Sequence, residues 1–350
     1  MDSLTHIVLG AAIADLTTGR RLGKRALLYG AVIGTLPDMD VAVGAFMSDI
    51  DKIIFHRGIT HSMLFWMVMA PVCGWVISRL EAGSGIGFKK AAFMSFLILF
   101  SHALIDSFTS YGTRLLIPIT SEAYAFSTIS IIDPFFSIWL WIAVPWVVFR
   151  RMDFEHRKKI LIAAIIISHL YLAGTIMNKV YIESQLERVF TRQNKDVIRF
   201  TSKPGLFSNL LWRGVAETED GYYTAYYALL AGPDDIEIRY EKKNHDLIQH
   251  LDDSRAVRRL ISVTDGYFTV DQVNDSLFVN DLRFGRISEW SKVGTPYAFS
   301  YKLIESEEST DILRVPIRFE GERDTRMLID LARRIAGKSV REPSRSAPAE

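Results

Sequence analysis

Residues 91–106 read AAFMSFLILFSHALID, an apolar run that closes on two chemically active side chains, His102 and Asp106. Such a run makes about four helical turns, and residues four apart lie on the same face of a helix. An ionisable group is costly within a bilayer, so it usually faces an interior site. The stretch therefore predicts a membrane helix whose end offers a histidine and an aspartate to one metal ion.

Further apolar segments flank this one. They cover residues 4–18, 26–36 with 41–47, 62–78, 135–149 and 160–177. Most are shorter than the roughly 20 residues that a spanning helix needs, and the first two are short enough to be half-spans or re-entrant segments. The alternative is a buried soluble helical bundle, which the charge-free, Trp- and Phe-rich run at 135–149 disfavours. We expect an all-α helical bundle in a membrane.

Basic residues alternate along the loops between these segments. Loops 19–25, 79–90 and 150–159 are rich in Lys and Arg, whereas loops 49–61 and 107–133 are poor in them. This alternation predicts an integral membrane protein whose basic loops are cytoplasmic, and we expect its membrane to be a bacterial-type inner membrane. The N-terminus and everything after residue 178 are then predicted to be extracytoplasmic.

The chain after about residue 184 is charged and alternates polar with apolar residues, as strands of a soluble domain do. Strands are expected at 222–230, 236–240, 267–270, 276–279 and 312–319, with an amphipathic helix at 323–335. The predicted organisation is a helical membrane domain with the metal site over 1–183, a small α+β soluble domain over 184–340, and a disordered Pro- and Ser-rich tail over 341–350.

The composition limits the classes of function. A net charge of +1 gives no basic field of the kind that attracts nucleic acid, so no nucleic-acid partner is expected. The single cysteine, Cys73, has no intramolecular disulfide partner and is interpreted as a small packing residue. The opening residues lack the positive region of a secretory signal, so we interpret them as part of the mature protein.

Seven His and Asp side chains fall at the predicted extracytoplasmic ends of the apolar segments. They are His6, Asp38, Asp40, His56, His61, His102 and Asp106. Imidazole and carboxylate groups bind divalent metal ions, zinc first, with manganese or iron as alternatives. The assignment of loops to the cytoplasm does not use these residues, so their common location supports both the topology and the metal site.

These assignments have structural alternatives. The neighbouring carboxylates Asp38 and Asp40 repel one another unless a cation lies between them, but Asp38 is also suited to cap a helix in a turn. The loop that carries His56 and His61 would alternatively meet lipid headgroups. Arg57 in this loop has the geometry to hold an anionic group such as phosphate.

Four motifs resemble a known family in their order and spacing. They are Asp2-x-x-Thr5-His6, Pro37-Asp38-x-Asp40, His56-Arg57-Gly58-x-Thr60-His61-Ser62 and His102-x-x-x-Asp106, which Tyr111-Gly112 follows. Over roughly residues 1–115 the chain resembles the YdjM-type family of membrane-bound metal-dependent hydrolases. The resemblance implies a helical membrane hydrolase whose metal ligands match the seven residues named above.

A fainter resemblance concerns the order of the His and Asp residues. It is similar to that of the zinc-dependent phospholipase C and nuclease P1 helical fold, which implies two or three zinc ions and a phosphoester substrate. That group has further His and Glu ligands late in the chain, and we place no counterpart of them here. The expected number of divalent ions is therefore one to three.

Two functions of different classes follow. The first is a membrane metal-dependent hydrolase in which a metal activates water, Arg57 stabilises developing negative charge and Asp40 serves as a base. Its partners would be membrane lipid and a small-molecule or lipid substrate. The second is a non-enzymatic membrane protein with a structural metal and a C-terminal domain that binds a partner or senses the envelope. A transporter is disfavoured, because the polar residues gather at one face and not at the membrane midplane.

Overall fold

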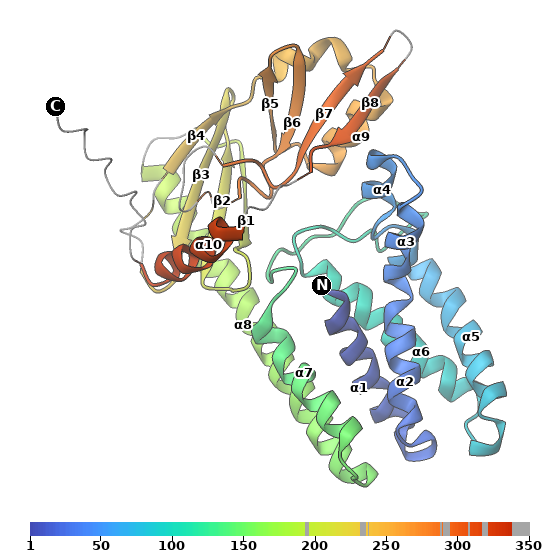
Figure 1. The fold of residues 1–350 in the computed structure, drawn as a ribbon. Helices are drawn as coiled ribbons and strands as arrows, with labels where there is room; N and C mark the ends of the chain where they lie inside the picture. The colour runs from blue at the N-terminus through green and yellow to red at the C-terminus, as the bar shows by residue number, and fades with distance from the viewer. Residues whose placement is uncertain are drawn as a thin grey trace. The chain divides into compact units, whose positions relative to one another are not determined.

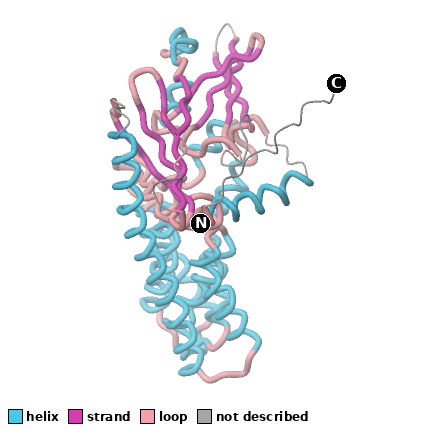
Figure 2. The backbone as a smooth tube through the Cα atoms, turned by 90° about the vertical axis from the view of Figure 1, so that its left-hand side faces the viewer, coloured by secondary structure: helices cyan, strands magenta, loops and turns pink. Residues whose placement is uncertain are grey.

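A computed structural model describes residues 1–192, 196–231, 236, 238–287, 289, 295–306, 309–316 and 321–337. The chain divides into two compact units. The first holds Met1–Lys179 with Lys203–Asn209, and the second holds Val180–Ser202 with Leu210–Glu350. Helices build the first unit, and the strands all come after residue 198 (Figures 1 and 2).

The first unit is a set of helices with short connections. They are α1 (Ser3–Leu22), α2 (Arg25–Thr35), η1 (Pro37–Met39), α3 (Asp40–Gly44), α4 (Asp49–Phe55), η2 (Ile59–His61), α5 (Met63–Leu80), η3 (Ala82–Ser84), α6 (Phe88–Ser107), α7 (Pro134–Phe149) and α8 (Phe154–Arg192). Helix α8 continues into the second unit.

Three of these helices, α5, α6 and α8, are long and apolar enough to cross a membrane. A fourth span results if α2 and the segment Pro37–Gly44 are taken together across their 44° bend. Helix α7 is apolar but shorter, and α1 carries Asp15, Arg20 and Arg21 and lies outside this set. The prediction of a helical N-terminal part with membrane-spanning segments is confirmed at this level.

Local signals fix where the helices begin. Asp2 caps α1 by accepting a hydrogen bond from the Thr5 amide at 2.9 Å. Ser62 caps α5, and Asp133 caps α7, in which Pro134 takes the first helical position. The residues that flank the predicted metal site are therefore held in place by hydrogen bonds at the helix ends.

Helices α1 and α2 approach each other closely at Gly10, Gly30 and Gly34. A β-carbon at Gly30 would stand 2.2 Å from the Gly10 carbonyl oxygen, and one at Gly34 would stand 2.6 Å from the His6 carbonyl oxygen. Gly30 and Gly34 have the four-residue spacing that lets helix backbones meet in membranes. This contact sets the first turn of α1 against the end of α2, and so brings His6 next to the residues that follow α2.

A buried ion pair joins α1 to α8. Arg157 donates to the two carboxylate oxygens of Asp15 at 3.1 and 3.0 Å, and also to the carbonyl oxygen of Gly19 at 3.2 Å. Both side chains are buried. A buried charge is tolerated when it is paired and hydrogen-bonded. Asp15 therefore links α1 to α8 at the end of α1 that lies away from His6.

The second unit contains two four-stranded antiparallel sheets. Their order is β1 (Arg199–Pro204), β2 (Leu211–Glu217), β3 (Gly221–Ala228), β4 (Ile238–Lys242), and β5 (Phe268–Val273), β6 (Ser276–Asp281), β7 (Ser300–Glu305), β8 (Thr310–Arg314). Three helical segments accompany them, η5 (His245–Leu251), α9 (Arg255–Val263) and α10 (Gly321–Ile335). In the first sheet Trp212 pairs with Tyr227, and both pack in the buried core.

The structure has strands and a helix where the sequence predicts them, with shifted ends, as β3, β4, β5, β6, β8 and α10. Strands β1, β2 and β7 and helix α9 are additions. Strand β2 is not predicted because residues 211–216 are all buried, so polar and apolar residues do not alternate along it. Of the predicted strand at 312–319, residues 317–319 lie outside the described residues, as does the tail 341–350.

A buried ion pair also stabilises the second unit. Arg213 on β2 contacts Glu289 at 3.0 Å, and Tyr226 donates a hydrogen bond to the same carboxylate at 2.9 Å. Burial raises the pKa of Glu289, but the Arg213 guanidinium outweighs it and holds the pKa below its ordinary value. The charged pair therefore forms part of the core of this unit.

Candidate metal centre

Four of the predicted ligands converge at one end of the helical unit. Asp38 lies in η1, His61 ends η2, and His102 and Asp106 lie in the last turns of α6. One ligand atom from each of the four lies within 4.8 Å of all the others. We call these four residues the ligand group. Segments that are up to 68 residues apart in the chain thus supply two imidazoles and two carboxylates to one small volume.

The ligand atoms face one another closely. The Nε2 atoms of His61 and His102 are 3.2 Å apart. Asp106 Oδ2 lies 3.3 Å from His61 Nε2 and 3.8 Å from His102 Nε2, and Asp38 Oδ1 lies 3.7 and 3.5 Å from the same two nitrogens. The side chains of His61, His102 and Asp106 are almost completely buried, whereas 12% of the Asp38 side chain is exposed. Three members of the group are therefore shielded from solvent, and Asp38 is the member that reaches the surface.

A backbone carbonyl orients the ring of His102. Its Nδ1 lies 2.8 Å from the carbonyl oxygen of Gly34, to which it donates in the neutral tautomer. The lone pair then lies on Nε2, which faces the other three ligands. Histidines that bind metals are held in this way, by a hydrogen bond from the nitrogen that does not bind the ion.

The carboxylate of Asp106 is held from several directions. Oδ1 contacts the Met1 amino group and lies within hydrogen-bond distance of His6 Nε2, at 3.0 Å. Arg57 Nε lies 3.1 Å from Oδ2 in ion-pair contact, but Oδ2 is buried and has no hydrogen-bond partner among the described residues. A buried carboxylate oxygen without such a partner is costly, and a cation among the four ligand atoms would satisfy it.

The ring of His6 stacks on that of His102, with ring centroids 3.6 Å apart. His6 is therefore placed beside the four-residue group and touches Asp106, but it is not one of the four. The sequence motifs predict His6 as a ligand, and that assignment stays a prediction.

Asp40 and His56 form a second layer next to the four residues. Asp40 accepts hydrogen bonds from the Arg57 amide at 2.9 Å and from the Thr60 hydroxyl at 3.0 Å, and lies 3.0 Å from His56 Nδ1. Its Oδ2 is also 3.6 Å from His61 Nδ1. Asp40 thus holds together the loop that carries His61, while its roles as ligand and base stay predictions.

Arg57 is buried and faces inward. Its Nη1 donates to the Thr109 hydroxyl at 2.6 Å, its guanidinium lies over the ring of Tyr111, and its backbone has a φ of 57°. A non-glycine residue rarely adopts this left-handed conformation, and the hydrogen bond from its amide to Asp40 holds it there. The guanidinium is therefore fixed against Asp106, and its predicted contact with developing charge on a substrate stays a prediction.

The surroundings of His61 favour positive charge. Burial disfavours the charged imidazole, but the carboxylates of Asp106 and Asp38, which lie 3.3 and 3.7 Å from Nε2, outweigh burial and raise the pKa of His61 above its ordinary value. The excess of carboxylate in the group therefore attracts a cation, either a proton or a metal ion.

The basic loops meet at the opposite end of the helices. Lys24 donates to the carbonyl oxygens of Val148 and Arg150 at 2.6 and 2.7 Å, and Arg25 pairs with Glu81 at 2.8 Å. Helix α1 has His6 in its first turn and Arg21 in its last, about 22 Å apart along the axis. The metal-ligand group and the basic loops therefore lie at opposite ends of the same helices.

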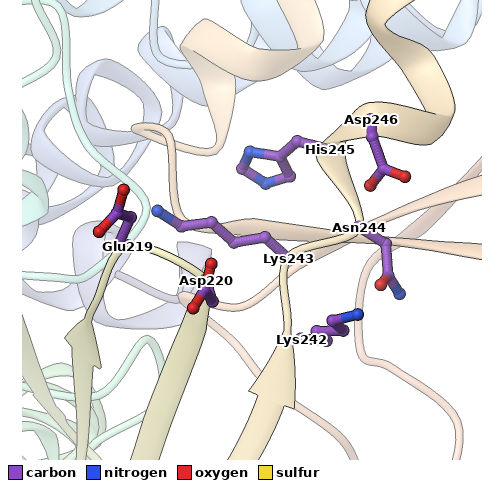
Figure 3. Close-up of a pocket in the computed structure, with 7 residues that line it drawn as sticks. All are labelled: Glu219, Asp220, Lys242, Lys243, Asn244, His245 and Asp246. Carbon is purple, nitrogen blue, oxygen red and sulfur yellow. The ribbon is translucent and has the colours of Figure 1, made fainter.

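The second unit has a separate pocket of about 500 Å³. Figure 3 shows the residues that line it, Glu219, Asp220, Lys242, Lys243, Asn244, His245 and Asp246. Lys243 pairs with Glu217 at 2.8 Å, and His245 stacks on Phe268 with centroids 3.9 Å apart. Its charges are mixed and its histidine is engaged in packing, so this pocket lacks the convergent donor set of the helical unit.

Two contributors to the site are not among the residues predicted from the sequence. Gly34 supplies the carbonyl that orients His102 and allows α1 to approach α2, and Thr109 receives the Arg57 guanidinium. The GxxxG spacing of Gly30 and Gly34 is a sequence signal for the first. The Thr109 contact has no signal in the spacing, because it joins a loop residue to another loop.

Comparison with known proteins gives a family match and two relatives. The family model described as YdjM inner membrane protein matches residues 1–182. The YfhP protein of Bacillus subtilis (strain 168) is 28% identical over 153 residues, which covers 39% of this chain and 43% of YfhP. The inner membrane protein YbcI of Escherichia coli (strain K12) is 28% identical over 109 residues, which covers 31% of this chain and 61% of YbcI. The chain thus spans about half the length of these curated relatives, and no solved structure matches it.

Proposed function

The chain belongs to the YdjM inner membrane protein family, and on this premise we propose that it is an integral-membrane metal-dependent hydrolase acting on a phosphoester or lipid-like substrate. The observation that carries the proposal is the group Asp38, His61, His102 and Asp106 at the ends of membrane helices. The group combines buried donors with a position at the edge of the membrane, as an enzyme of amphiphilic substrates requires.

The donor set fits a divalent ion. Two imidazole nitrogens and two carboxylate oxygens are ligands that zinc accepts in four-coordinate sites, and manganese and iron accept the same types. The unsatisfied Asp106 Oδ2 and the fixed tautomer of His102 support this assignment. Asp38, His61, His102 and Asp106 would hold the ion, with His6, Asp40 and His56 around them.

When bound, a divalent ion supplies Lewis acidity, which polarises a phosphoryl oxygen and lowers the pKa of water. The protein's own residues prepare the site. Arg57 holds Asp106 and places positive charge next to it, and Asp40 keeps the His61 loop in position. The side chain of His56 is 25% exposed, and Asp40 contacts its Nδ1 at 3.0 Å.

The orientation in the membrane follows from charge. Since the basic loops lie at the end opposite the ligand group, the tendency of such loops to remain cytoplasmic supports a site on the extracytoplasmic side. The C-terminal domain after α8 would lie on that side too, where lipid and small amphiphilic substrates are accessible.

A hydrolysis assay tests this proposal. The full-length protein in detergent is offered bis-p-nitrophenyl phosphate and phosphatidylglycerol vesicles, with and without a chelator. We expect hydrolysis that the chelator abolishes, that zinc or manganese restores, and that His61→Ala removes. His169→Ala is the matched control, because His169 is exposed on α8, contacts the Ile165 carbonyl oxygen and the ring of Phe136, and is not part of the ligand group. Hydrolysis that withstands both the chelator and His61→Ala would contradict the proposal.

Burial of the ligand group favours a second function, a structural metal in a non-enzymatic membrane protein. Four protein donors complete a tetrahedral shell, and closed shells are typical of structural zinc. Cobalt substitution separates the two functions. If added phosphate changes the visible spectrum of the cobalt protein, the ion has an open position and catalysis is supported; an unchanged spectrum supports the structural role.

A further inference from the structure

The segment that carries two of the predicted ligands also exposes a continuous apolar surface. Residues 41–47 read VAVGAFM, and 50% of Val41, 49% of Val43, 93% of Phe46 and 36% of Met47 is exposed. In the same segment Asp40 and Gly44 are buried. We call residues 41–47 the apolar tip. Its apolar side chains are exposed while the carboxylate of Asp40, just before it, is buried, the reverse of a loop that faces water.

The length of the α2–α3 segment places the apolar tip at membrane depth. Helix α2 alone has 11 residues and measures about 16 Å, half the hydrocarbon thickness of roughly 30 Å. Only together with Pro37–Gly44 does it pass as a span. Laid end to end, the residues from Arg25 to Gly44 measure about 30 Å, and the 44° bend shortens this distance along one axis. If the pair forms one span, α3 completes the crossing and the exposed Val41 and Val43 lie at the apolar layer.

Further apolar side chains are exposed at the same end of the helical unit. The residues just before and after the start of α5 are exposed as well, Ile59 by 45%, Met63 by 48% and Leu64 by 43%. The polarity changes at Ser48, which caps α4, and Lys52 on that helix is exposed. The apolar tip is therefore followed in the chain by the short helix α4, which exposes Lys52.

We propose that the apolar tip inserts into the lipid leaflet and that the ligand group receives its substrate from the bilayer, as an amphiphile with an anionic headgroup. Acyl chains would pack on Val43 and Phe46, while the headgroup reaches the group at Asp38, its partly exposed member. The insertion of the apolar tip is independent of the proposed hydrolase function. The delivery of substrate from the bilayer rests on that proposed function.

The composition of the apolar tip favours lipid as the partner that covers it. A soluble protein seldom exposes so many adjacent large apolar side chains unless a partner covers them. Here the first four residues of the apolar tip belong to the segment Pro37–Gly44, which together with α2 is apolar enough to cross a bilayer, in a member of an inner membrane protein family. A cover formed by another protein is an outcome that the test below distinguishes.

Spin-label accessibility tests the insertion. In full-length protein with Cys73→Ser, single labels are placed by Phe46→Cys, Lys52→Cys and Val72→Cys, and the protein is reconstituted in phosphatidylethanolamine and phosphatidylglycerol vesicles. Val72 is 45% exposed near the middle of α5 and serves as the lipid reference. We expect the label at 46 to collide with oxygen as often as the label at 72 does, and several-fold more often than the label at 52. A label at 46 that collides instead with a water-soluble nickel chelate, or with neither reagent, overturns the insertion.

Substitution of the apolar tip tests substrate delivery. Phe46→Asp should lower hydrolysis of vesicle phospholipid by roughly tenfold or more relative to hydrolysis of soluble bis-p-nitrophenyl phosphate. Phe149→Asp is the matched control, because Phe149 is 83% exposed at the opposite end of the helices. Equal loss on both substrates overturns delivery from the bilayer. A protein that hydrolyses neither substrate, yet carries a lipid-exposed label at 46, contradicts the hydrolase function and leaves the insertion supported.

Discussion

Single residues in the ligand group are each held by a neighbour. The Gly34 carbonyl orients His102, His6 and Arg57 contact Asp106, and Asp40 holds the His61 loop. Such outer contacts fix the direction of a lone pair before an ion arrives. They also divide the seven predicted residues into four that face one another and three that surround them.

This division predicts different effects for two aspartates. Asp106→Ala should abolish metal binding, because it removes a facing donor. Asp40→Ala should weaken binding by about 10–100-fold without abolishing it, because it removes an outer contact. Titration of metal-free protein with zinc in the presence of a competing chelator measures both affinities. Equal and complete loss in the two variants would show that Asp40 is itself a ligand.

The Arg213–Glu289 pair makes a prediction for the second unit. Arg213→Met leaves Glu289 buried without its partner and should cost about 3–5 kcal/mol of local stability. Hydrogen exchange of the β2 and β3 amides should then accelerate by about a hundredfold or more. Arg258→Met is the control, since Arg258 is 61% exposed and lies 3.9 Å from Asp253. Similar exchange in both variants would contradict the role of the pair.

The same pair sets a pH dependence. Because the folded pKa of Glu289 is below its unfolded value, the pair contributes stability above that unfolded value of about 4.5 and loses it as the pH falls through the folded pKa. In Arg213→Met the unpaired carboxyl is instead costly when charged. Acidification toward pH 4 should therefore slow exchange at β2 in this variant relative to the wild-type trend, after correction for intrinsic exchange. Parallel pH trends in the two proteins would argue against the assignment.

Among the elements, the α1–α2 contact connects packing to the site. Gly34 touches the His6 backbone and its carbonyl orients His102, so one close helix approach positions two of the seven residues. The membrane supplies no hydrophobic force between helices, and small residues allow the backbone contact that replaces it.

Gly34→Leu should separate α1 from α2 and reduce metal content, because the added side chain meets the His6 carbonyl oxygen. Gly174→Leu is the matched control: Gly174 lies in α8, and a β-carbon there meets nothing within 4 Å. Metal analysis of the two purified variants, with circular dichroism to confirm that both remain helical, checks this expectation. Full metal content in folded Gly34→Leu protein would contradict it.

Sequence patterns predict the elements unevenly. Long apolar runs such as 91–105 and capped starts such as Asp133-Pro134 specify helices directly. Strand β2 is buried along six consecutive residues and α9 is shorter than three turns, so periodicity identifies neither. The residue types of the site follow from its motifs, but which side chains face one another depends on distances of 3–4 Å between separate segments, such as that from Asp38 to His102. Spacing in the sequence does not encode such distances.

At the scale of the whole molecule, the helical unit is polar at both ends in different ways. One end gathers carboxylates and imidazoles, and the other gathers the basic loops of residues 19–25, 79–90 and 150–159. The proposed orientation follows from this asymmetry, since basic loops tend to be retained in the cytoplasm.

Thiol labelling tests the orientation. In a Cys73→Ser background, Glu122→Cys lies in the connection from α6 to α7 near the ligand end, and Ser84→Cys lies in η3 at the basic end. A membrane-impermeant maleimide should label residue 122 in intact spheroplasts and residue 84 only after lysis. The reverse pattern would place the ligand group in the cytoplasm.

The central claim is that side chains from separate helices hold one divalent ion at the membrane edge. X-ray absorption at the metal edge, combined with elemental analysis of the purified full-length protein, tests it most directly. We predict at least one ion per chain with a shell of nitrogen and oxygen that includes two imidazoles, and loss of the ion in His102→Ala but not in His169→Ala. Protein that purifies without metal and binds none when it is supplied, or that retains the same shell in His102→Ala, would contradict the account.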